Sequence, residues 1–204
     1  MTETNVQGNW VRFDLLGTNQ TLAGVQDIVG GLVIQNGGIG VGSPTAATLT
    51  VDNTADYTIG SHFRNQDNVA SGPLNFVKSG SGTLTLTRLA DGVNNRTTYT
   101  GTTTVNGPGT LKLVNLYDGS ANAFNSAVTV NAGATLLMAS TIDSSFNAGV
   151  AITLNGGTLS HTGTGYQTLA GTVTLTADST ISVANSGANN QLFLDAALIG
   201  VNRA

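Results

Sequence analysis

Charged residues, cysteine and proline are scarce in this chain of 204 residues. It contains no cysteine, which excludes disulfides and thiolate metal sites, and only three prolines. Charged residues make up 9% of the chain, whereas about a quarter is usual in soluble domains. The 7 basic and 11 acidic residues give a net charge of −4. Because binding to nucleic acid needs clustered cations and these are scattered, we expect no nucleic-acid partner.

Long apolar runs and helical periodicity are missing too. No window carries helix-forming residues at helical spacing, and no stretch approaches the roughly 20 apolar residues of a membrane span. We therefore expect no membrane span in this chain. Residues 1–7 have neither the basic start nor the apolar core of a signal peptide. We interpret the chain as a section of a longer exported protein with an added initiator Met.

Threonine, glycine and apolar residues are arranged in short alternating runs. The 27 glycines, together with asparagine, separate runs such as Leu84-Thr85-Leu86 and Leu111-Lys112-Leu113. Such alternation predicts strands with one buried and one solvated face. Glycine and asparagine between the runs favour tight corners. The chain is therefore expected to be all-β.

Two series of apolar positions repeat in the C-terminal half. One series contains Val128/Val130, Ile152/Leu154, Val173/Leu175 and Leu192/Leu194, and the other contains Leu111/Leu113, Leu136/Met138, Leu159/His161 and Ile181/Val183. The steps of about 19–25 residues are typical of solenoids. Strands this short cannot bury a face alone, so we predict stacked coils. The expected fold is a single-stranded right-handed parallel β-helix of about eight or nine coils. It forms one segment over residues 1–204, and an antiparallel sandwich is the competing interpretation.

The N-terminal half is less regular but contains the same kinds of residue. Runs such as Leu32–Ile34, Thr48–Val51 and Leu74–Val77 are expected to be strands. Two longer segments without the repeat, Leu89–Arg96 and Asn115–Ser126, are expected to leave otherwise even coils as surface excursions. Neither interrupts the repeat enough to indicate a domain boundary.

Asparagine recurs at one corner of successive units. Asn106, Asn131 and Asn155 each follow the first strand of a unit, at steps of about 25 and 24 residues. A solenoid would stack them, and an amide both donates and accepts hydrogen bonds. We therefore predict a structural asparagine ladder. Asparagine also tolerates the left-handed backbone that we expect at a sharp corner. The alternative is that each asparagine suits only its own turn.

One segment resembles a known family. Lys78-Ser-Gly-Ser-Gly-Thr-Leu-Thr-Leu-Thr87, followed after an insert by Tyr99-Thr-Gly-Thr-Thr-Thr-Val-Asn-Gly-Pro-Gly-Thr-Leu-Lys-Leu113, resembles the autotransporter-associated β-strand repeat, or passenger-associated transport repeat. The best match is residues 78–113. Thr102 and Pro108 depart from the family pattern, both in turns. The resemblance implies a right-handed β-helix in a secreted or surface-displayed bacterial passenger, where the repeat assists transport or stacking. It implies no catalytic residue.

Ionisable side chains give no constellation for chemistry. Asp52, Asp56 and Asp67 are interpreted as solvated turn carboxylates, since a calcium site needs several converging oxygen ligands. His161 shares the phase of Leu159 and is expected to be packed or at a corner, and His62 is expected to be exposed. We therefore predict no catalytic residue, no cofactor and no metal site.

Three classes of function follow, with a structural transport module expected. The alternatives are an adhesin-type surface for a glycan, a host ligand or ice, and a polysaccharide-active β-helix enzyme. Ice binding would use Thr-x-Thr rows, which Ala127-Val-Thr129 and Ala151-Ile-Thr153 interrupt. The expected location is secreted or at the bacterial cell surface. Expected partners are neighbouring repeats of the passenger or a second copy, through end-to-end association near Gln191–Asp195, because open strand edges invite pairing.

Overall fold

A computed structural model gives the structure of the chain. It describes residues 11–28, 31–38, 41–42, 45–60, 62–65, 72–87, 97–114, 124, 126–139, 141, 144–146, 150–184, 191–195 and 197–200. The expected excursion at Leu89–Arg96 lies outside these residues, as does most of the one at Asn115–Ser126. Over the described ranges the secondary structure consists of strands, with no helix.

Most strands belong to two parallel sheets that run along the molecule. The first sheet contains β2 (Gln20–Leu22), β6 (Ala47–Asp52), β9 (Leu74–Ser79), β11 (Thr103–Val105), β13 (Val128–Asn131), β16 (Ile152–Asn155), β19 (Val173–Leu175) and β22 (Leu198–Gly200). The second sheet contains β7 (Tyr57–Ile59), β10 (Thr83–Thr87), β12 (Thr110–Val114), β14 (Thr135–Met138), β17 (Thr158–His161) and β20 (Thr180–Val183).

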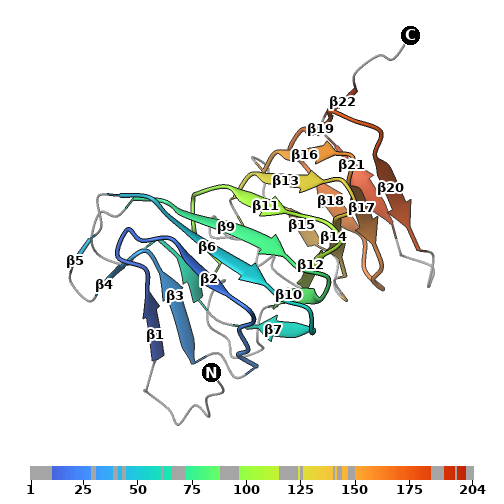
Figure 1. The fold of residues 1–204 in the computed structure, drawn as a ribbon. Helices are drawn as coiled ribbons and strands as arrows, with labels where there is room; N and C mark the ends of the chain where they lie inside the picture. The colour runs from blue at the N-terminus through green and yellow to red at the C-terminus, as the bar shows by residue number, and fades with distance from the viewer. Residues whose placement is uncertain are drawn as a thin grey trace.

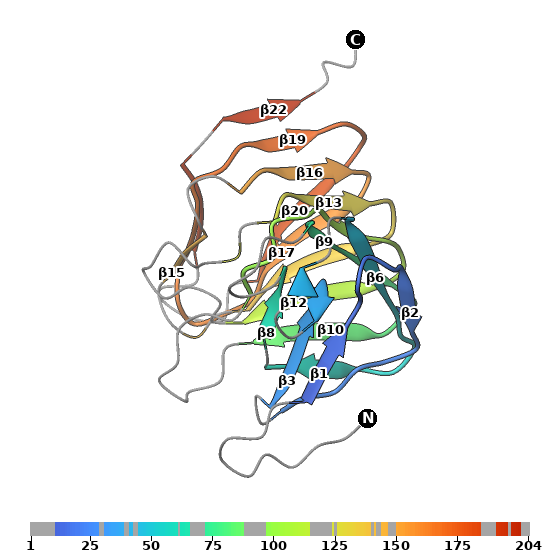
Figure 2. The same ribbon diagram turned by 90° about the vertical axis from the view of Figure 1, so that its left-hand side faces the viewer.

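Shorter sheets complete the coils near the two ends. One contains β1 (Val11–Asp14), β3 (Leu32–Gln35) and β8 (His62–Arg64), and the other contains β15 (Ser144–Phe146), β18 (Gln167–Leu169) and β21 (Leu192–Leu194). Their strands precede the first-sheet strands β2, β6, β9, β16, β19 and β22, whereas no short-sheet strand lies directly before β11 or β13 in the part of the chain that the structure describes. A short antiparallel pair, β4 (Gly37–Gly38) and β5 (Val41–Gly42), protrudes between β3 and β6. Figures 1 and 2 show the first-sheet strands stacked as successive rungs.

The stacked parallel strands confirm the β-solenoid and exclude the antiparallel sandwich. Each turn passes from a first-sheet strand to a second-sheet strand. Equivalent strands of successive turns pair in parallel, as β13 pairs with β16 and β14 with β17. There are about six turns, fewer than the eight or nine expected. The expectation was too high because the outermost coils, with β2 and β22, contribute a strand to the first sheet and none to the second.

The observed register confirms one apolar series and corrects the other. Leu111, Leu136, Leu159 and Ile181 are successive partners in the second sheet, as expected. In the first sheet, however, Val173 pairs with Leu198. The expected partners Leu192 and Leu194 instead pair with Gln167 and Leu169 in the short sheet. In the last coil the strand that we assigned to the first sheet therefore belongs to the short sheet, and the following strand, β22, takes its expected place.

Alternation along each strand fills the interior of the solenoid with apolar side chains. Residues of β9 and β10 are buried at every second position, which places Leu74, Phe76, Leu84 and Leu86 inside. Each inward side chain packs on its counterparts in the coils above and below. Stacking therefore supplies the burial that a single short strand cannot achieve.

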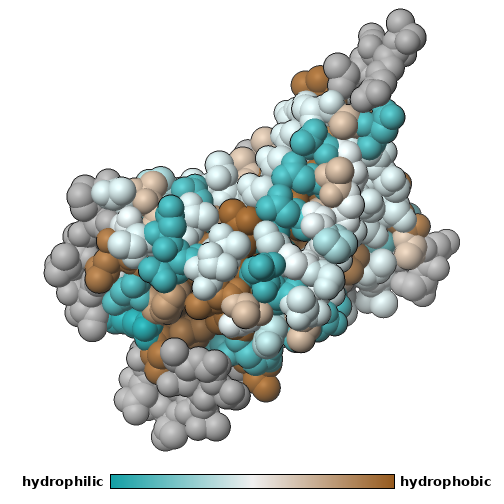
Figure 3. Space-filling model, viewed as in Figure 1, coloured by the Kyte–Doolittle hydropathy of each residue, from teal (hydrophilic) through white to brown (hydrophobic). Residues whose placement is uncertain are grey.

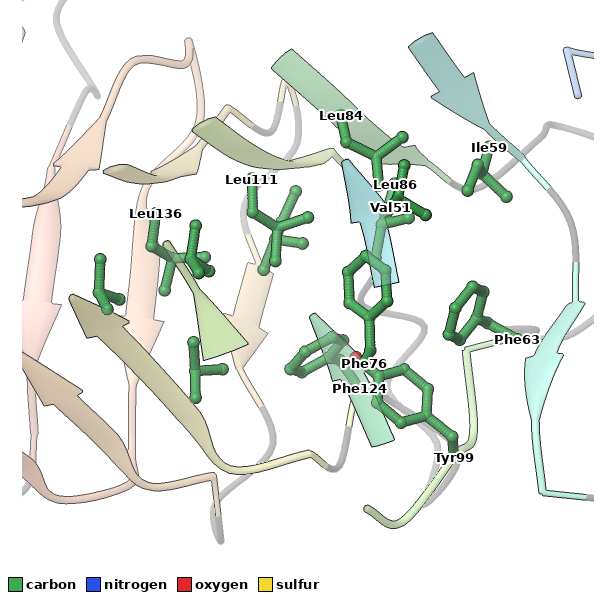
Figure 4. Close-up of a cluster of buried hydrophobic side chains, with 14 of the residues drawn as sticks. Val51, Ile59, Phe63, Phe76, Leu84, Leu86, Tyr99, Leu111, Phe124 and Leu136 are labelled. Atoms are coloured by element: carbon green, nitrogen blue, oxygen red, sulfur yellow. The ribbon is translucent and has the colours of Figure 1, made fainter. Parts of the chain in front are cut away.

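An aromatic cluster occupies the interior of the middle coils (Figure 4). The ring of Phe63 lies 5.1 Å from that of Phe76 and 5.1 Å from that of Tyr99, both edge-on. Phe124 approaches Tyr99 at 5.7 Å, with the planes at 85°. Edge-to-face pairs at such distances add about 0.5–1.5 kcal/mol each beyond area burial. The cluster therefore links aromatic side chains of successive coils.

Candidate functional site

The three corner asparagines hydrogen-bond to one another in series. Asn131 donates from Nδ2 to Oδ1 of Asn106 at 2.8 Å, and Asn155 donates to Oδ1 of Asn131 at 3.0 Å. Their backbones are in register, since Asn131 pairs with Asn155 where β13 meets β16. Asn106 follows β11 directly and Asn131 closes β13. We call these three residues the asparagine ladder.

Hydroxyl side chains extend the asparagine ladder at both ends. Asn106 donates from Nδ2 to Ser79 Oγ at 3.3 Å, and Thr176 Oγ1 donates to Asn155 Oδ1 at 3.1 Å. The row therefore crosses five successive coils in one direction of donation. Such chains polarise one another, so the bonds reinforce each other.

The backbone at this corner differs from the expectation for asparagine. A positive φ falls on the glycines that follow, with +76° at Gly133 and +81° at Gly156, whereas Leu16 is the non-glycine residue with positive φ among the described residues. Glycine adopts this region without the Cβ clash, so it makes the sharp bend. The bend therefore does not require asparagine, and the contribution of the ladder asparagines is the hydrogen bonds of their side chains.

Lys78 is a buried cation near the end of β9, at the corner between the first and second sheets. Its side chain is fully buried, in phase with Leu74 and Phe76. Nζ donates to the carbonyl oxygens of Ser79 at 2.5 Å and Gly80 at 3.0 Å. Burial lowers the pKa of Lys78, and Asp52 and Asp56 act in the opposite direction. The ammonium group is thereby held at the corner, while its stem packs in the core.

A second buried polar feature is a hydrogen-bond network that joins the hydroxyl groups of Tyr99, Thr103 and Ser126. The Tyr99 hydroxyl lies 2.6 Å from Thr103 Oγ1, which lies 2.7 Å from Ser126 Oγ. Ser126 in turn donates to the carbonyl of Gly101 at 2.6 Å. Burial raises the pKa of Tyr99 far above its ordinary value, and the hydrogen bonds to Thr103 and Ser126 oppose that rise. Every member is buried, so the network is unsuited to acid–base work in solvent.

The carboxylates and carboxamides mainly hold neighbouring coils together. Asp56 Oδ1 accepts from the backbone N–H of Thr83 at 2.7 Å. Gln35 donates from Nε2 to Asp14 Oδ1 at 2.7 Å and accepts at Oε1 from Arg64 Nε at 3.0 Å. Asp52 and Asp56 are both exposed, as predicted, but Asp52 is the last residue of β6 and not part of a turn; Asp67 lies outside the described residues. The carboxylates of Asp14 and Asp56 thus accept hydrogen bonds from residues of neighbouring coils.

Other corner amides have partners that are distant in the sequence. Asn36 is fully buried, accepts from the Gly17 N–H at 2.8 Å, and donates to carbonyls of Thr45 and Gly72 at 2.8 and 2.9 Å. Asn65 Oδ1 accepts from the backbone N–H groups of Leu74 and Thr100. Sequence reasoning missed these residues because their partners lie up to 37 positions away, with no repeat to indicate them.

The histidines do not form a site together. His161 is fully buried on the inner face of β17, in register between Met138 and Val183, as its phase predicted. His62 is half-buried in β8, so the expectation of an exposed side chain was wrong. Within the described residues no three His, Cys, Asp or Glu side chains lie close enough together to hold a metal ion.

The outer face of the first sheet carries a row of threonines. Going from coil to coil, the positions in register are Thr21, Thr50, Val77, Thr104, Thr129, Thr153, Thr174 and Ile199. We call this the threonine row; Val77 and the terminal Ile199 are its only departures. The neighbouring row is mixed, since it contains Ala127 and Ala151. This face appears pale between hydrophilic patches in Figure 3.

Comparisons with known proteins add no relative. No protein-family model, curated protein or solved structure matches this chain. Among the described residues, no helix has the length and apolar character needed to cross a bilayer.

Proposed function

We propose that this chain is a non-catalytic, structural repeat module of a secreted or surface-displayed bacterial passenger of the autotransporter type. The single observation that carries the proposal is the series of in-register coils joined by the asparagine ladder. Backbone pairing, apolar rows and the ladder all repeat from coil to coil, as a stacking element requires. The resemblance of residues 78–113 to the passenger repeat supplies the link to export.

The use of the polar side chains supports a structural role. Asp56, Gln35 and Asn36 hydrogen-bond across coils, and the Lys78 ammonium group binds corner carbonyls. Catalysis by a β-helix enzyme would need an acid and a base facing a common substrate position. The hydrogen bonds described here point instead to stabilisation of the coil stack.

A display experiment tests the proposal. The whole chain would be placed between a secretion leader and an outer-membrane barrel, and surface exposure measured by protease accessibility on intact cells. We expect efficient display, which Leu136→Asp should reduce because Leu136 is fully buried. Leu137→Asp is the matched control, since Leu137 lies next to it on the half-exposed outer face of β14. Retention of the unmodified chain inside the cell, or equal display of both variants, would contradict the proposal.

The threonine row favours one second candidate, binding of the outer face to an ordered surface such as ice. Parallel strands repeat the row at about 4.8 Å per coil. Thermal hysteresis of the purified chain, lost on Thr129→Glu, would support this candidate. A chain without thermal hysteresis would exclude it.

A further inference from the structure

Among the described residues, no strand covers the interior of the solenoid at its C-terminal end. In the second sheet the fully buried Leu159 is followed in register by Ile181, which is 37% exposed. In the first sheet Val173, 2% exposed, is followed by Leu198, 53% exposed. The same rows of apolar side chains thus pass from buried to exposed at the last coil. They are exposed because no further described coil covers them.

The backbone at this end is open as well. β21 and β22 are each the last strand of their sheet, so one edge of each has no strand partner among the described residues (Figure 1). We call β21 and β22, with Leu192, Leu194 and Leu198, the C-terminal end face. These two strand edges lie on different sides of the apolar interior. A single extended peptide would pair with only one of them, so a partner that pairs with both must itself be a coil.

The N-terminal end has the complementary features. β1 and β2 are the first strands of their sheets, and their inward residues Val11, Phe13 and Leu22 are only partly buried against the core. A cavity of about 150 Å³ lies beside them, lined by Phe13, Leu22, Gly24, Val25, Leu32 and Ile34. Apolar surface is visible next to this end in Figure 3. We call β1 and β2, with Val11, Phe13 and Leu22, the N-terminal end face.

We propose that the C-terminal end face binds the N-terminal end face of a second copy, so that copies stack head to tail with the first sheet and the short sheets continued from one copy to the next. The chain order supports this occupant. At both ends of the chain a short-sheet strand precedes a first-sheet strand, as β1 precedes β2 and β21 precedes β22, so β1 and β2 can pair with β21 and β22 in the same order. The interface continues the coil-to-coil pairing already present within the chain. It joins two different surfaces, which makes an open series of copies rather than a closed dimer.

Continuing the internal register gives specific contacts. Since Leu192 and Leu194 already occupy inward positions, Val11 and Phe13 would stack on them in the same phase. In that register Asp195 falls opposite Asp14. Like charges directly opposite each other on neighbouring strands oppose pairing. The carboxylates would therefore limit the strength of association without preventing it.

The head-to-tail geometry is tested with two variants, each blocked at one end. Leu194→Glu disables the C-terminal end face, and Phe13→Glu disables the N-terminal end face. Analytical ultracentrifugation should show the unmodified protein growing in size with concentration, and each variant alone should remain monomeric. An equal mixture of the two variants should form dimers and no larger species, because one competent end of each kind remains.

The outcomes separate this proposal from its alternatives. Dimerisation of either variant alone would indicate contact between identical ends and overturn the proposal, as would an unmodified protein that is monomeric at every concentration. Circular dichroism and urea unfolding verify that both variants are folded. Asp195→Asn provides an independent measurement that leaves the apolar contacts intact, and we expect at least a several-fold tighter association. Unchanged or weaker association of this variant would refute the stated register. This inference goes beyond the proposed function and does not depend on export.

Discussion

Replacement of Asn131 by alanine tests whether the asparagine ladder stabilises the solenoid. Asn131 is its middle member, so the substitution removes the bonds to both Asn106 and Asn155. Each side-chain hydrogen bond contributes about 0.5–1.5 kcal/mol net. Asn155 is exposed and the other two are half-buried, so water reaches part of the freed groups. We therefore expect Asn131→Ala to lower the free energy of unfolding by about 1–2 kcal/mol.

Urea unfolding followed by circular dichroism provides the measurement, with the midpoint and the slope analysed together. Thr129→Ala is the matched control, because Thr129 lies on the outer face of the same strand. It measures the loss of β propensity without removing a ladder bond. A double-mutant cycle of Asn131→Ala and Asn155→Ala then isolates the bond between the two amides, with an expected coupling of about 0.5–1.5 kcal/mol.

Two results would refute the reasoning about the ladder. One is a loss of stability in Asn131→Ala no larger than in Thr129→Ala. The other is a coupling energy near zero in the double-mutant cycle. Either result would mean that each amide only suits its own turn, and that water replaces the ladder bonds at no cost.

The remaining predictions concern buried residues. Leu136→Asp should lower the free energy of unfolding by several kcal/mol, because it buries an unpaired carboxylate, whereas the outward Thr85→Asp should be tolerated; equal urea midpoints would show that the strand phase is wrong. Lys78 has a lowered pKa in the folded state, so the unfolded state binds more protons at pH values below 10.5, the ordinary pKa of lysine, and stability should rise as the pH increases towards that value; Lys78→Met should abolish that rise in urea midpoints. The raised pKa of Tyr99 has the opposite sign: stability should fall as pH rises above 10.0, where the unfolded tyrosine ionises, and a fall that persists in Tyr99→Phe would contradict this assignment.

The regular part of the solenoid could be predicted from the sequence because a parallel sheet repeats the same phase in every coil. The row that joins Leu111, Leu136 and Leu159 and the stacking of Asn131 with Asn155 both follow from constant steps along the chain. The same alternation also indicates that Lys78 is buried, which we did not predict. Lys78 lies two and four positions after Phe76 and Leu74, so its phase points inward.

The tertiary structure decided what depends on variable connections and on contacts between distant residues. Leu192 and Leu194 have the alternation of a first-sheet strand, but the number of residues between β20 and β21 places them in the short sheet beside Leu169. The partners of Asn36 come from coils whose spacing does not repeat, and the Tyr99–Thr103–Ser126 network joins Thr103 to Ser126, two positions that are not equivalent in their coils. A local pattern in the sequence determines which face of a strand is buried, because side chains alternate along every strand. Which strands meet depends on how far each connection travels, and this is settled only when the coils stack.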